Sequence, residues 1–130
     1  MDVLEDMAEI TADNAGGTLR YFAGGDPDTR DIEPLFVRED LEWNDAREEE
    51  VESELLGVAA KETHEYFMAV ENVNQIIKVA DTKVLFTGFV EDEVAVAAFD
   101  RGVFPHLPEM VAAFREYMIE HDVEFVTLEM

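Results

Sequence analysis

The stretch NQIIKVADTKVLFTGFVEDEVAVAAF, residues 74–99, decides the fold of this 130-residue chain. It contains three runs rich in β-branched and aromatic residues, at 74–80, 83–90 and 93–99, and two residues separate each run from the next. Connections of two residues are typical of β-hairpins. We therefore predict three consecutive strands that pair antiparallel.

The second and third of these runs are apolar at consecutive positions, as in VLF and VAVAA. A strand with one face in water alternates between apolar and polar residues, whereas a strand buried on both faces does not. We therefore expect helices, or a second copy of the chain, to cover both sides of the sheet.

Upstream of this stretch, the sequence predicts one helix and one hairpin. Residues 2–15 carry apolar side chains at helical spacing and stop at two glycines, as a helix with a glycine cap does. TLRYFA (18–23) and EPLFVRE (33–39) flank a GGDP turn and predict two strands. Pro34 suits a strand end or an edge strand, because proline provides no ladder donor.

Two further helices complete the expected fold. Asp45 and Glu48 resemble a capping box that opens a long helix, and the glutamates of that helix mostly fall on its solvent side. Pro108 suits the start of a last helix, which reaches about His121. We predict a single domain, residues 1–130, of α/β (α+β) type. It has a five-stranded, mainly antiparallel sheet in the order α-β-β-α-β-β-β-α, flanked by about three helices, with a C-terminal strand at 123–129 left open.

The charge of the chain is strongly one-sided. The chain has 32 Asp and Glu residues against 9 Lys and Arg residues, which gives a formal charge of -23. Hydrophobic residues nevertheless make up 48% of the chain. The carboxylates are spread through every segment, which favours a solvated surface adapted to concentrated salt over an acidic interaction module of a low-salt cell, in which the charge would be clustered. Direct binding to nucleic acid or to an anionic membrane is disfavoured because no basic stripe exists.

Other features of the sequence predict a cytoplasmic protein and argue against catalytic, cofactor and metal sites. The chain has no cysteine, no apolar run long enough to span a bilayer and an acidic N-terminus, unlike a signal peptide. No nucleophile, phosphate-loop or zinc pattern occurs, so we expect no catalytic residue, no cofactor and no specific metal site.

Three weaker candidate sites remain. Asp26, Asp28 and Asp31 imitate the start of a calcium loop but lack its glycine and distal glutamate, so we interpret them at most as loose cation ligands. Trp43 either packs back on the following helix or serves as an exposed interface anchor. A pocket between sheet and helix would have a lining of four aromatic rings, namely Phe86, Phe89, Phe99 and Phe114.

Two resemblances follow from these segments. LRYF, LFVRED and KVLFTGFVEDEVAVAAFDRG resemble a group of short, acidic, uncharacterised proteins common in salt-loving archaea, over residues 18–114. The order of elements is similar to the roadblock, longin and profilin-like layout, which implies dimeric scaffolds, small-GTPase regulators or sensors.

We therefore expect a non-catalytic, halophilic, cytoplasmic interaction or regulatory domain, a homodimer with a further protein partner. The alternative is a small-molecule sensor with the aromatic pocket described above, and an enzyme is a third interpretation.

Overall fold

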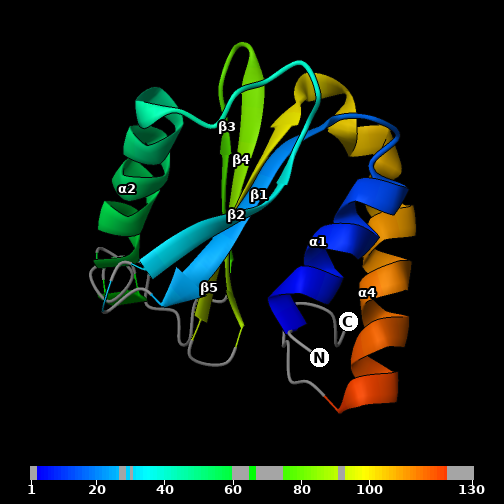
Figure 1. Ribbon diagram of the computed structural model, residues 1–130. Helices are drawn as coiled ribbons and strands as arrows, with labels where there is room; N and C mark the ends of the chain where they lie inside the picture. Colours follow the sequence, from blue (N-terminus) through cyan, green and yellow to red (C-terminus); the bar gives the residue numbers. More distant parts are fainter. Residues whose placement is uncertain are drawn as a thin grey trace.

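The computed structural model describes residues 3–26, 29, 31–59, 65–66, 75–90 and 93–122 (Figure 1). The expected strand at 123–129 and the turn at Glu91-Asp92 lie outside these residues. No helix in the described part of the chain is both long and apolar enough to cross a membrane.

The five predicted strands form one antiparallel sheet. They are β1 (Leu19–Asp26), β2 (Asp31–Val37), β3 (Gln75–Val79), β4 (Lys83–Val90) and β5 (Glu93–Asp100), in the spatial order β2-β1-β5-β4-β3. The pairing of β3 with β4 and of β4 with β5 confirms the predicted meander. The hairpin of β1 and β2 joins it through pairing of β1 with β5.

The helices cover both faces of this sheet, as the apolar strands predicted. α1 (Val3–Asn14) and α4 (Leu107–His121) lie side by side on one face, and α2 (Asp45–Ala59) lies on the other (Figure 1). A short 3-10 helix, η1 (Arg101–His106), leads from β5 into α4.

Alternation along β5 divides the interior into two cores. Ala95, Ala97 and Phe99 face α1 and α4, in a cluster that includes Met7 and Met110. The intervening residues Val96 and Ala98 face α2, where they pack with Tyr21, Ala23 and Val51. All of these side chains are buried, so each face of the sheet forms a separate apolar layer.

Two local expectations can be compared with the described residues. Pro34 lies in β2, which is an edge strand, as a proline without a ladder donor requires. The cap of α2 was predicted one residue too late, because Asn44, not Asp45, caps the helix. The Asn44 Oδ1 accepts a hydrogen bond from the backbone N–H of Arg47 at 3.2 Å.

Candidate functional site

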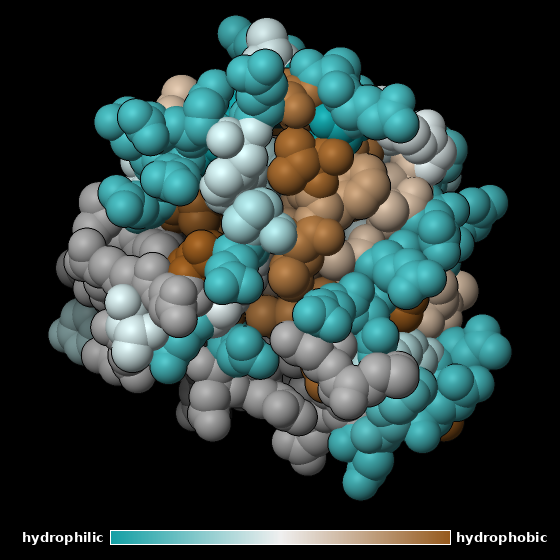
Figure 2. Space-filling view, in the orientation of Figure 1, coloured by the Kyte–Doolittle hydropathy of each residue, from teal (hydrophilic) through white to brown (hydrophobic). Residues whose placement is uncertain are grey.

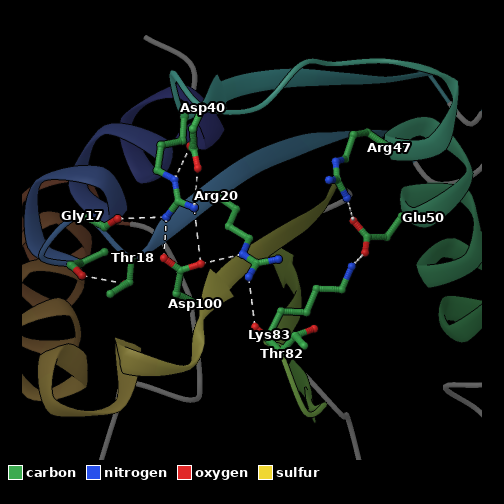
Figure 3. A network of polar contacts seen from close by, with 11 residues as sticks. Gly17, Thr18, Arg20, Asp40, Arg47, Glu50, Thr82, Lys83 and Asp100 are labelled. Atoms are coloured by element: carbon green, nitrogen blue, oxygen red, sulfur yellow. Dashed lines mark hydrogen bonds and ion pairs between the residues drawn. The ribbon is translucent and has the colours of Figure 1, made fainter.

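Arginine and aspartate side chains form a polar network where three segments meet (Figure 3). Asp100, at the end of β5, accepts a hydrogen bond from Arg20 Nε at 2.7 Å and another from Arg38 Nη1 at 2.6 Å. Arg38 follows β2 directly and also donates from Nε to Asp40 Oδ1 at 2.6 Å. One carboxylate of β5 therefore holds an arginine of β1 and an arginine directly after β2.

The same arginines reach backbone carbonyls in two turns. Arg38 Nη1 donates to the Gly17 carbonyl at 3.1 Å, in the connection between α1 and β1. Arg20 Nη2 donates to the Thr82 carbonyl at 3.0 Å, in the turn between β3 and β4. The network thus joins the ends of distant segments, which suits a structural clamp.

Hydrogen bonding within the network favours the charged forms of Arg38, Asp40 and Asp100. Hydrogen bonds from Arg38 hold the pKa of Asp40 and of Asp100 below the usual aspartate value. Hydrogen bonds to Asp40 and then to Asp100 raise the pKa of Arg38 further above its already high value. Because these shifts move the pKa values of Arg38, Asp40 and Asp100 further from neutrality, the three groups are poorly suited to general acid–base catalysis.

A second group of charges surrounds Glu50 on α2. Its carboxylate accepts a hydrogen bond from the Tyr21 hydroxyl at 2.8 Å, and it pairs with Lys83 on β4 and with Arg47 at 3.6 Å. Burial lowers the pKa of Lys83, and the positive charges of Arg47 and Arg20 lower it further. The contacts of Glu50 with Tyr21 and Lys83 attach α2 to the sheet.

Sequence reasoning placed the glutamates of α2 mostly toward solvent and did not single out Glu50. Glu48, Glu49 and Glu52 are indeed exposed. Glu50 differs because it precedes the buried Val51 and lies three residues after Arg47, an opposite charge at helical spacing. That combination was the available signal in the sequence.

The predicted cation ligands are only partly described. Asp26 and Asp31 lie opposite each other at the end of the β1–β2 hairpin, and Asp28 lies outside the described residues. Within the described ranges, no group of three or more His, Asp or Glu side chains could hold a metal ion.

Trp43 packs against the α2-side core. Its ring meets the ring of Tyr21 edge to face, with centroids 5.4 Å apart and an angle of 76° between the planes. The side chain remains half-buried, so a role as an interface anchor stays a prediction.

The four phenylalanines predicted to line one pocket do not share a face of the sheet. Phe86 and Phe99 meet edge to face at 5.1 Å in the core under α1 and α4, where Phe114 also packs. Phe89 lies an odd number of residues from Phe86 on the same strand, so its side chain points to the α2 side. The error was to group the rings by residue type without following the alternation of β4.

The described surface offers two other features. A groove of about 680 Å³ lies between α1 and β2, with Leu35 and Phe36 among its lining residues. At the opposite edge of the sheet, β3 exposes Ile77 and Val79 to 49% and 55%. Large apolar side chains at this level of exposure are typical of contact surfaces when they lie together.

An antiparallel five-stranded sheet between one helix and a helix pair defines a roadblock-like α+β fold, and a comparison with solved structures agrees. Myxococcus xanthus MglB matches with a TM-score of 0.62 at 11% sequence identity, over 97% of this chain and 96% of that chain. At this identity the likeness establishes the fold alone. The chain itself belongs to the family described as Domain of unknown function (DUF7522), whose model matches residues 5–119. A search of curated proteins finds no significant match.

Proposed function

We propose that the protein is a non-catalytic interaction or regulatory module of a salt-rich cytoplasm and that it acts as a homodimer. The observation that carries this proposal is the outer edge of β3. The roadblock-like fold supports it, because the resemblance drawn from the sequence implied dimeric scaffolds and regulators.

The edge of β3 is suited to strand pairing. It ends the sheet, so its outward backbone N–H and C=O groups have no ladder partner among the described strands. Ile77 is opposite Phe86 and Val79 is opposite Val84, which places both exposed side chains on the α1 and α4 side of the sheet. A second β3 strand would bury these two side chains and satisfy the backbone together.

The register of such a pairing follows from the charges of β3. In an antiparallel pair centred on Ile77, Lys78 of one copy lies opposite Ile76 of the other. A pair centred on Lys78 would place two ammonium groups directly opposite, which is unfavourable. We therefore place the two-fold axis at Ile77, and the two sheets become one continuous sheet.

Light scattering tests this proposal. In about 2 M KCl, where the Debye length is below about 3 Å, the wild-type chain should have twice its monomer mass of 14.7 kDa. Ile77→Lys/Val79→Lys should be monomeric, because each copy would present new charges along the paired edge.

Ile119→Lys is the matched control. Ile119 is also a large exposed apolar residue, at 79%, but it lies on α4. It should leave the dimer mass unchanged. A monomeric wild type, or a dimer that Ile119→Lys abolishes and the β3 variant does not, would contradict the proposal.

A further inference from the structure

The groove between α1 and β2 has an apolar floor that the described residues leave open. Figure 2 shows apolar side chains in a strip between these two elements, with hydrophilic side chains on both sides. Leu35 and Phe36 of β2 are only half-buried there, and Ala8 and Ala12 form the α1 wall. Alanines one turn apart leave room for another element to approach α1 closely.

The rim of the groove is acidic on both sides. Glu5, Glu9 and Asp13 follow one another at intervals of four along α1, so they form one stripe, and Glu33 lies on the β2 side. All four are exposed, and none forms an ion pair within the part of the chain that the structure describes.

This rim contrasts with the ion-paired carboxylates of the network. Arg20, Arg38, Arg47 and Lys83 are all used in the network that neutralises Asp40, Asp100 and Glu50. Those cations therefore do not offset the negative charge of the carboxylates at the rim of the groove. Its negative potential is complementary to a cationic occupant.

Two residues of β2 indicate whether that occupant binds as a strand or as a helix. Pro34 lacks an N–H and Glu33 adds a charge, two features that block strand addition at an edge. A helix needs no backbone partner, because its hydrogen bonds are internal. An amphipathic helix would place an apolar stripe on Leu35 and Phe36 and its flanking cations against the two rims.

We propose that this groove binds a basic amphipathic helix of a partner protein. This inference deepens the proposed function by naming the binding surface and the partner's chemistry. It does not depend on the β3 dimer, because the groove lies at the opposite edge of the sheet.

A designed peptide tests the proposal. The probe is a fluorescein-labelled helix of about 14 residues of Leu and Lys, with leucines at the i, i+3, i+4 and i+7 spacing. Fluorescence anisotropy is measured at the lowest KCl concentration at which circular dichroism shows the full chain folded. Glu9→Lys/Asp13→Lys should weaken binding roughly tenfold or more, since it reverses two rim charges.

The matched control is Glu49→Lys/Glu52→Lys, which makes the same change of charge at exposed positions on α2, across the sheet from the groove. This pair should weaken binding by less than about twofold. Equal losses from both pairs would show non-specific attraction to an anionic chain and overturn the proposal. So would equal binding of a peptide with every leucine replaced by glutamine, because the apolar floor would then be irrelevant.

Two other possible occupants of the groove are distinguished by peptide binding to a truncated chain and by light scattering. If deletion of residues 123–130 strengthens peptide binding tenfold or more, the chain's own terminus occupies the groove and the partner proposal fails. If Glu9→Lys/Asp13→Lys changes the mass in light scattering, a second copy of the chain occupies it. If the wild type is a monomer and still binds the peptide selectively, the β3-dimer proposal fails and the proposal for the groove is supported.

Discussion

At the scale of single residues, the carboxylates of this chain differ by their neighbours and not by their type. Asp100 and Glu50 are held by cations from other elements, whereas Glu9 and Asp13 have no ion-pair partner in the described ranges. The sequence contains 32 acidic residues and cannot distinguish these groups, because Arg20 and Asp100 are eighty positions apart. Only the pairing of β1 with β5 brings them together.

The first prediction concerns Asp100. Asp100→Asn should lower the free energy of unfolding near pH 7 by roughly 1 kcal/mol, allowing for the solvent that reaches this half-exposed pair. Arg38 lowers the pKa of Asp100 below 3.8 in the folded chain, so this stability is present above pH 3.8 and is lost as the pH falls through the folded pKa. Urea unfolding between about pH 7 and pH 3 measures the difference between the two chains.

The control for that measurement is Asp13→Asn, which removes an equal charge from an exposed position in the groove. It should leave stability unchanged or raise it slightly at pH 7, because the chain carries excess negative charge. If the two variants behave alike, the network around Asp100 contributes nothing to stability.

At the scale of elements, hydrophobic periodicity and turn residues predicted nearly all of the described architecture. The three runs between residues 74 and 99 became β3, β4 and β5, and the two glycines after α1 ended it as expected. What failed were details set by tertiary contacts. Asp45 was expected to cap α2, but Asn44 caps it. Phe86 and Phe89 were expected to line one pocket, but their side chains lie on opposite faces of the sheet. The network and the groove were not predicted, since both join elements that are distant in the sequence.

The end of α1 provides the second prediction. Gly16 and Gly17 both have left-handed φ angles, of 61° and 78°. A Cβ on Gly16 would collide with the imidazole ring of His106, whereas one on Gly17 would meet no atom within 4 Å. Gly17→Ala should cost about 1 kcal/mol for the backbone conformation, and Gly16→Ala should cost at least about 1 kcal/mol more.

Thermal unfolding of both variants measures these costs, and the His106→Ala background identifies their origin. Without the imidazole, the two alanine substitutions should become equally costly. A persistent excess at Gly16 would mean that the ring of His106 is not the obstacle.

At the scale of the whole molecule, the roadblock-like layout was predicted from the order of elements, and the sheet with its helices confirms it. Membership of the DUF7522 family adds domain identity over residues 5–119. The adaptation to salt remains a prediction drawn from the formal charge of -23.

The third prediction tests that adaptation. The midpoint of urea unfolding should rise steeply between about 0.1 M and 1 M KCl, because the Debye length falls from about 10 Å to about 3 Å. Glu49→Lys/Glu52→Lys raises the formal charge by four from -23, so its midpoint should rise less over the same range. Equal stability at every salt concentration in the wild type would contradict a brine-adapted surface.

The unlike edges of the sheet set a limit on assembly. In the dimer proposed from β3, the outermost described strands of the doubled sheet would both be β2, and each contains Pro34, which has no N–H to donate to an added strand. Growth of the sheet by strand addition would therefore stop at the proposed dimer. Such a dimer would leave no unblocked strand edge among the described strands, so it should stay a dimer at high protein concentration and should not extend into filaments.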